Sequence, residues 1–360
     1  MIDSWCKNAA LGLLWLVMVT ACGHRPTATD LPMRLPQPLS NHAVAYLNIN
    51  GQDQFYTFNG LRAGKTHRDI SNQAHVWYGG QWHDLQPPKT QQPVLASVAV
   101  TVGDSVYLFG GYTVAADHSE HSVPNVWRIH GQDHQWTALP PMPTPVDDAV
   151  ALVYQARYIY LISGWHDVDN VDLVQVFDVE TQTWQQASPW PMPPVFGHAG
   201  GMVGNQMVVC DGVKVAWSGE QKSFLPSPAC AMGTINPQQI TEINWQPIPH
   251  HSGTAFYRMA AASDAAQQIF FVAGSDNPYN YDGIGYNGVP SAPSATVRQF
   301  DLNTQQWTIK AGLIPASMDH RSLLRTPHGY MIMGGMGPQQ AVLDHITTIK
   351  TTVLETSKQP

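Results

Sequence analysis

A short apolar run that ends in a glycine doublet, or in a close variant of one, occurs six times along the chain. The six endings are Asn59-Gly60, Gly110-Gly111, Ser163-Gly164, Asp211-Gly212, Ala273-Gly274 and Gly334-Gly335. Their second glycines are separated by 51, 53, 48, 62 and 61 residues. Five endings are followed by a tryptophan, namely Trp82, Trp136, Trp184, Trp245 and Trp307. Self-similarity with a period near 50 residues is typical of β-propellers, in which each repeat forms one blade.

The second repeat illustrates the folding unit. Its apolar, β-rich runs cover Val94–Val102, Val106–Phe109, Val126–Ile129 and Trp136–Leu139, with turn-forming residues between them. Four short strands joined by turns make one propeller blade. The glycines permit close backbone packing near the axis, and the tryptophan offers an apolar face between blades. We therefore predict an all-β, six-bladed propeller with four-stranded antiparallel blades.

The sixth repeat is irregular, because it lacks the tryptophan. Its C-terminal run, His345–Leu354, is expected to form one long strand. The N-terminal stretch Asp30–Pro38 resembles the segments that follow the other tryptophans. We therefore expect the N-terminus to supply the outer strand of the last blade, which removes an open sheet edge. The alternative is closure by Thr351–Glu355.

Composition argues for a single folded domain without affinity for nucleic acid. Of the 360 residues 12% are charged, and the net charge is −8 with histidine neutral. Nucleic-acid binding rests on clustered Lys and Arg, and no such cluster occurs. All repeats of a propeller share one ring, so the repeats indicate one domain, which we expect to be a monomer.

The first residues indicate export. Lys7 precedes an apolar stretch from Ala9 to Ala21, which is short for a membrane span. The stretch ends in Val19-Thr20-Ala21-Cys22, which resembles a bacterial lipobox. That resemblance implies a signal peptide over 1–21, lipidation of Cys22 and a tether or closing strand over 22–38, with the propeller over 39–356. Because Gly23, not aspartate, follows the cysteine, it implies an outer-membrane lipoprotein facing the periplasm. The alternative is an ordinary secretory signal.

Two cysteines remain outside this segment, Cys210 and Cys230. An even remainder in an exported chain predicts one disulfide. Cys210 ends one strand, and Cys230 lies where the neighbouring strand is expected to begin. Two buried free thiols are the alternative.

Two repeats share the pattern Asp-x-x-Thr-x-x-Trp, at 178–184 and 301–307. Together with the preceding strands that end in Gly-Gly, this pattern resembles the kelch repeat, over roughly residues 40–350. The resemblance implies that loops following the glycine doublets open on the functional face, flanked by the loops that lead into the innermost strands.

The loops of blades four and five on that face are longer than those of blades one to three. From second glycine to tryptophan the separations are 22, 25, 20, 33 and 33 residues. The blade-five loop, 275–288, mixes tyrosines with Asp and Asn, a composition that suits a carbohydrate. Its candidate ligand-binding residues are Asn277, Tyr279, Tyr281 and Asp282. A self-packed loop is the alternative, and calcium is disfavoured because Pro278 occupies the first-ligand position.

Further candidates occupy matching loop positions in the other repeats. They are Arg62, Tyr112, Trp165, His166, His198, His320 and Arg321. Arginine can bind a carboxylate with two hydrogen bonds. The pairs His118/His121 and His250-His251 are interpreted as polar loop and strand-leading residues, since no spacing supplies the further ligands of a zinc site. No metal or cofactor is expected.

These features favour an envelope recognition module that binds a glycan, a small sugar or a protein partner. The alternative is a sugar isomerase, because the chain also resembles the periplasmic kelch N-acetylneuraminate epimerases, or sialic-acid mutarotases. In that family a glutamate just past the fourth glycine ending accepts a proton, but Val213 stands here. Asp211 and Glu220 are nearby but are interpreted as turn or surface groups. Galactose oxidase also carries kelch repeats, but its copper site needs a cysteine that the disulfide uses.

Overall fold

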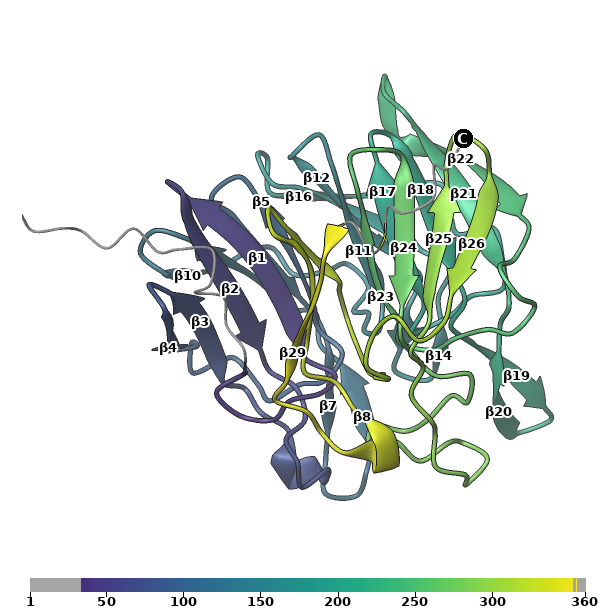
Figure 1. Cartoon of the computed structure of the whole chain (residues 1–360), viewed down its shortest axis with the longest axis horizontal. Helices are drawn as coiled ribbons and strands as arrows, with labels where there is room; N and C mark the ends of the chain where they lie inside the picture. Colours follow the sequence, from purple (N-terminus) through teal and green to yellow (C-terminus); the bar gives the residue numbers. More distant parts are fainter. Residues whose placement is uncertain (1–33, 352–353, 355–360) are drawn as a thin grey trace, which may run out of the picture.

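The computed structural model describes residues 34–351 and Leu354 as an all-β ring of six sheets (Figure 1). Blade one contains β1 (Ala43–Ile49), β2 (Gln52–Phe58), β3 (Ala74–Tyr78) and β4 (Gln81–Leu85). Blade two contains β5 (Val98–Val102), β6 (Ser105–Phe109), β9 (Val126–His130) and β10 (Trp136–Ala138). Blade three contains β11 (Val150–Tyr154), β12 (Tyr158–Ile162), β15 (Val174–Asp178) and β16 (Thr183–Gln186).

The remaining blades continue the pattern. Blade four contains β17 (Ala199–Val203), β18 (Gln206–Cys210), β21 (Cys230–Asn236) and β22 (Gln239–Ile248). Blade five contains β23 (Ala260–Ser263), β24 (Gln268–Val272), β25 (Val297–Asp301) and β26 (Gln306–Lys310). Blade six contains β27 (Leu324–Thr326), β28 (Gly329–Met333) and β29 (Ile346–Ile349). All pairings within the blades are antiparallel, so the predicted six-bladed propeller is confirmed.

Three short hairpins and two 3₁₀ turns leave the blades between the second and third strands. The hairpins are β7 (Tyr112–Val114) with β8 (Glu120–Ser122), β13 (Trp165–His166) with β14 (Asp169–Asn170), and β19 (Val213–Ser218) with β20 (Gln221–Pro226). The 3₁₀ turns are η1 (His67–Asp69) and η2 (Pro338–Gln340). No helix in the described part of the chain is long and apolar enough to cross a membrane. The residues before Arg34, on which the predictions of a signal peptide, lipidation at Cys22 and a tether fall, lie outside the described residues.

The N-terminal segment closes the ring at the outer edge of blade six. Arg34 forms an antiparallel bridge with His345, and the Leu35 amide donates to the Asp344 carbonyl at 2.7 Å. The expected N-terminal closure is therefore present, as a single bridge in the described residues. The long C-terminal strand is a correction: β29 ends at Ile349, and Thr351 and Leu354 are helical. The Leu354 side chain is completely buried between blades five and six.

The repeated tryptophans link neighbouring blades by hydrogen bonds. In four of them the indole Nε1–H donates to a backbone carbonyl in the segment that follows the outer strand of the preceding blade. The pairs are Trp82 with Arg34 (2.8 Å), Trp184 with Pro140 (3.0 Å), Trp245 with Ser188 (3.3 Å) and Trp307 with Pro249 (2.8 Å). The Trp82 bond confirms that the N-terminal segment takes the place of the segment after a sixth tryptophan.

The predicted disulfide is confirmed, and the free-thiol alternative is wrong. Cys210 at the end of β18 lies directly opposite Cys230 at the start of β21, with a Cα–Cα distance of 4.2 Å. Both side chains are buried between blades four and five.

Six residues just before the innermost strands form a ring around the axis. All have a positive φ, between 49° and 69°; they are Asn41, Ala96, Asp148, Gly197, Arg258 and Asp319. The amide of each of the first five donates to the carbonyl of the ring residue in the preceding blade, at 2.8–3.2 Å, and the amide of His320 completes the cycle on Arg258 at 3.1 Å. Asn and Asp tolerate this conformation, but it strains Ala96 and Arg258, so the closed cycle of backbone hydrogen bonds holds these two residues in an unfavourable conformation around the axis.

Candidate functional site

The loops that follow the glycine doublets and the loops that lead into the innermost strands meet on one face. A β-bridge joins them in every blade: Ser40–Leu61, Leu95–Tyr112, Asp147–Trp165, Phe196–Val213, Tyr257–Ser275 and Met318–Met336. Figure 1 shows the hairpin strands β7, β8, β14, β19 and β20 on the same side of the blades. We call this side the loop face.

A cavity of about 370 Å³ lies at the loop face, between the hairpins of blades two to four and the long loop of blade five. Six aromatic side chains line it: Tyr112, Trp165, Phe196, Phe224, Tyr281 and Tyr286. Its charged lining includes Glu120, Asp147, Asp148, Asp167, Lys222 and Arg258. We call this cavity the loop-face pocket.

The aromatic rings form a connected wall. Trp165 meets Phe196 at a centroid distance of 5.4 Å and Phe224 at 5.8 Å. Phe224 in turn stacks on Tyr286 at 4.1 Å, with only 24° between the ring planes. The Lys222 ammonium lies 4.5 Å from the centre of the Trp165 ring, within the range of a cation–π interaction. Rings contributed by three blades thus line one cavity.

Two carboxyl groups of the pocket have raised pKa values. Burial, together with the charge of Asp148, raises the pKa of Asp147 well above its usual value, which favours the neutral form. The Ser122 hydroxyl donates to Asp147 Oδ2 at 2.6 Å. Glu120 is solvent-exposed, but the concave surroundings desolvate its carboxyl and raise its pKa to about 6. A carboxyl group with the raised pKa of Glu120 can exchange protons with a ligand near neutral pH.

A buried ion network forms the floor of the pocket at the axis. Arg258 donates two hydrogen bonds to Asp148, at 2.5 and 3.1 Å, and a third to Asp319 at 2.9 Å. The guanidinium of Arg321 also bonds to Asp148. Burial alone would raise the pKa of Asp148, but Arg258 and Arg321 hold it below its usual value. The network joins ring residues of blades three, five and six.

Five of the residues predicted from sequence lie at or directly beneath this pocket. Tyr112, Trp165 and Tyr281 line it. Tyr279 is fully buried below it, with its hydroxyl 3.5 Å from Asp319. Arg321 belongs to the axial ion network through Nη1, while its Nε and Nη2 have no acceptor among the described residues.

Six other predicted residues make contacts elsewhere. Arg62 donates to the carbonyls of Arg68 and Asp69 in its own loop. Four others each bond to a backbone group: His166 Nδ1 to the Pro145 carbonyl, Asn277 to the Val289 carbonyl, Asp282 to the Ile284 amide, and His198 Nε2 to the Ile162 carbonyl. His320 Nε2 lies 2.9 Å from the Ser317 hydroxyl. The blade-five loop is therefore partly self-packed, as its alternative interpretation held.

The sequence reasoning did not select Glu120, Asp147, Asp148, Lys222 or Arg258. A signal for three of them was available, because Asp147-Asp148 and Tyr257-Arg258 stand at the same repeat position as Met318-Asp319, directly before His320-Arg321. Alignment of all six repeats on that position would have found them. Lys222 on β20 carried no such signal in the sequence, since no other repeat has a hairpin as long as β19–β20.

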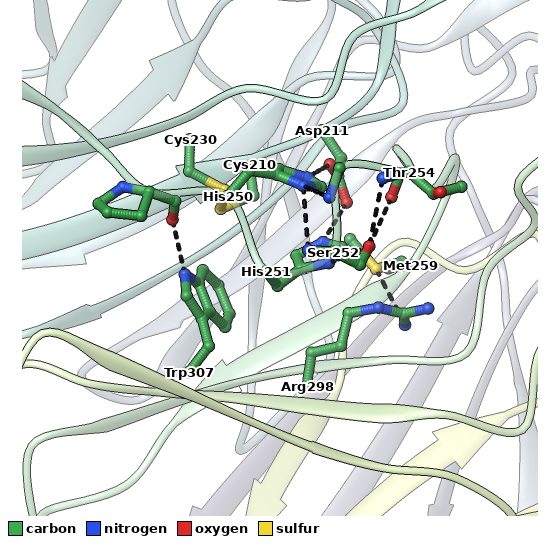
Figure 2. The surroundings of a disulfide bond; sticks show 12 residues. Cys210, Asp211, Cys230, His250, His251, Ser252, Thr254, Met259, Arg298 and Trp307 are labelled. Carbon is green, nitrogen blue, oxygen red and sulfur yellow. Dashed lines mark hydrogen bonds and ion pairs between the residues drawn. A yellow bond between two sulfur atoms is a disulfide. The ribbon is translucent and has the colours of Figure 1, made fainter.

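A second polar cluster lies between blades four and five, beside the disulfide (Figure 2). The Asp211 carboxylate is hydrogen-bonded to two histidines, through Oδ1 to His250 Nε2 at 2.5 Å and through Oδ2 to His251 Nε2 at 2.9 Å. Asp211 is almost completely buried, so its interpretation as a turn or surface group is corrected: it anchors the segment that leads into blade five. These three groups could converge on a metal ion. However, His250 Nδ1 accepts the Gly253 amide at 2.8 Å, which places the ring proton on Nε2 and prevents neutral His250 from ligating there.

Comparisons with known proteins agree with this fold. A family model described as the kelch motif matches residues 95–143. Kelch-like protein 15 of Homo sapiens is 22% identical over 262 residues, which is 71% of this chain and 40% of that protein. A putative F-box/kelch-repeat protein of Arabidopsis thaliana is 31% identical over 108 residues, covering 30% of this chain and 26% of its own. The chain thus spans 40% or less of the length of these relatives.

Among solved structures, one titled "Structure of YjhT" superimposes with a TM-score of 0.70. It is 15% identical and covers 89% of this chain and 97% of its own. Identity at this level speaks for the fold alone. Together with the six blades and the kelch motif, it shows that the chain folds as a six-bladed kelch-type propeller.

Proposed function

We propose that this propeller is a recognition module that binds a carbohydrate in the loop-face pocket. One observation carries the proposal: Trp165, Phe224 and Tyr286 present a connected aromatic wall opposite carboxyl groups. Aromatic faces pack against the C–H surfaces of a sugar, and carboxylates accept hydrogen bonds from its hydroxyls. The lipobox-like residues Val19-Thr20-Ala21-Cys22 support the further proposal that the protein is held in the bacterial envelope by a lipid on Cys22.

The charges of the pocket favour a neutral sugar. Arg258 is matched by Asp148 and Asp319. The remaining cation, Lys222, shares the pocket lining with the carboxyl groups of Glu120 and Asp167. The mouth of the pocket therefore offers no net positive charge to an anionic ligand. A neutral, hydroxyl-rich ligand uses the carboxylates as acceptors without electrostatic repulsion.

Isothermal titration calorimetry with a panel of neutral and acidic monosaccharides and disaccharides tests this proposal. We expect saturable binding of a neutral sugar by the parent protein and weakened binding by Tyr281→Ala and Lys222→Ala. Ile309→Ala is the control, because Ile309 is exposed on the outer strand β26, away from the pocket. Absence of saturable binding to every sugar would refute the proposal and leave a protein ligand as the partner.

A second candidate is sugar mutarotation, favoured by the raised pKa values of Glu120 and Asp147. Ring opening needs a base to take the anomeric hydroxyl proton and an acid to protonate the ring oxygen, while the C1–O bond of the ring breaks and a carbonyl forms. Glu120 would act as the base and Asp147 as the acid, and reclosure on the other carbonyl face returns both protons. Val213 has no proton-transferring group and is fully buried in an apolar cluster, so it takes no part in this chemistry.

Polarimetry of freshly dissolved reducing sugars tests the second candidate. The parent protein should accelerate equilibration of the anomers, and Glu120→Gln should abolish the acceleration while leaving sugar binding. An equilibration rate equal to that of buffer alone would eliminate mutarotation and leave recognition.

A further inference from the structure

The hairpin β19–β20 extends the aromatic wall of the loop-face pocket outward. Trp217 lies opposite Lys222 in its register, and Val215 lies opposite Phe224. Directly opposed residues, and residues two apart along a strand, share one face of a hairpin. Trp217, Lys222 and Phe224 therefore stand on the same face, and Lys222 and Phe224 already line the pocket.

Along β19, burial on this face decreases from the first residue of the strand toward the turn of the hairpin. Val213, at the inner end of β19, is fully buried, Val215 is half-buried, and Trp217, at the outer end, is 51% exposed. Two residues along a strand span roughly 7 Å, which is comparable to the length of one sugar unit. Trp217 thus lies about one sugar unit farther out than the pair Val215–Phe224.

The exposed indole is held in a fixed orientation next to the pocket. Its Nε1–H donates to Asp169 Oδ2 in the blade-three hairpin at 2.9 Å. The Lys222 ammonium lies 5.7 Å from the centre of the Trp217 ring and 4.5 Å from that of Trp165, so one cation stands between the outer and the inner indole. At 51% exposure this indole leaves apolar surface in water beside the pocket, and a ligand that covers it gains the free energy of its burial.

We propose that Trp217 forms an outer sugar subsite, so that the ligand is an oligosaccharide or the end of a glycan chain. One sugar unit occupies the loop-face pocket against Trp165 and Phe224, and the next unit stacks on Trp217. This proposal rests on the proposed carbohydrate recognition and names its substrate class.

The test compares affinities along two series of neutral sugars, measured by calorimetry with the full chain. The series are glucose, maltose and maltotriose, and N-acetylglucosamine, chitobiose and chitotriose. In one series we expect the disaccharide to bind on the order of 5- to 10-fold more tightly than the monosaccharide, which corresponds to one additional aromatic contact. Trp217→Ala should remove this gain and leave the monosaccharide affinity unchanged, whereas Trp217→Phe should retain part of it.

Leu225→Ala is the matched control. Leu225 is 41% exposed on the same hairpin, but it pairs with Lys214 on the opposite face and should not alter the gain. Equal affinity for monosaccharide and oligosaccharide, or a gain that persists in Trp217→Ala, would overturn the outer subsite and leave carbohydrate recognition standing. Absence of binding to every sugar would refute the proposed function itself, and the subsite with it.

Discussion

Replacement of Asp148 by asparagine tests whether the axial ion network holds the floor of the loop-face pocket. Asp148 is the shared partner of Arg258 and Arg321, and the side chains of all three are at most 4% exposed. Removal of one member of a buried ion pair costs about 3–5 kcal/mol, because a buried charge loses its partner. Asparagine tolerates the φ of 50° at this position, so the loss arises from charge and not from backbone strain.

The assay is equilibrium unfolding in urea, followed by tryptophan fluorescence and circular dichroism. We expect Asp148→Asn to lower the free energy of unfolding by about 3–5 kcal/mol. The double variant Asp148→Asn/Arg321→Met removes the uncompensated cation and should recover about 2 kcal/mol of that loss. Glu180→Gln breaks the exposed pair with Arg157 and should change stability by less than about 1 kcal/mol. A loss below about 1 kcal/mol for Asp148→Asn, or strict additivity in the double variant, would refute this reasoning.

Three further predictions concern stability. Burial lowers the pKa of His198 to about 4, so the parent protein loses stability as the pH falls below 6.5, where this histidine is protonated in the unfolded chain but not in the folded one. The variant His198→Asn escapes this loss, so its free energy of unfolding in urea should rise by about 2 kcal/mol relative to that of the parent between pH 7 and pH 5. A difference between variant and parent that does not change with pH would contradict this prediction. Trp82→Phe removes the hydrogen bond to the Arg34 carbonyl and should lower the free energy of unfolding by about 1 kcal/mol more than Trp136→Phe does, because Trp136 Nε1 has no acceptor among the described residues. Equal losses of stability in the two variants would count against ring closure by the N-terminal segment. The double change Cys210→Ala/Cys230→Ala opens a covalent link spanning 20 residues and should lower the free energy of unfolding by about 3 kcal/mol, and an unchanged denaturation midpoint would argue against the disulfide.

The glycine endings and tryptophans were sufficient to predict the ring of six blades, because each repeat carries its own turn and packing signals. The same periodicity assigned Asp30–Pro38 to the place that follows a sixth tryptophan, and the bond from Trp82 to Arg34 confirms that placement for the described part of this stretch, from Arg34 onward. The end of the last strand was not predictable in this way. Its termination depends on the burial of Leu354 between two blades, which no local pattern in His345–Leu354 reveals.

The composition of the candidate site was harder to predict than its location. Loop positions correctly indicated one shared face, but the ion network joins Asp148 to Arg258 across 110 residues and to Arg321 across 173 residues. Such pairings follow from ring closure, not from local spacing. For the same reason Arg321 and Tyr279 could be selected from the sequence while their commitment to buried carboxylates could not.

The most direct test of carbohydrate recognition is a crystal structure of the protein with its tightest-binding sugar. The account predicts a sugar ring stacked on the wall formed by Trp165 and Phe224, with its hydroxyls donating to Glu120 or Asp167. A sugar bound on the face opposite the loop face, or a loop-face pocket without bound sugar in crystals saturated with it, would contradict the account.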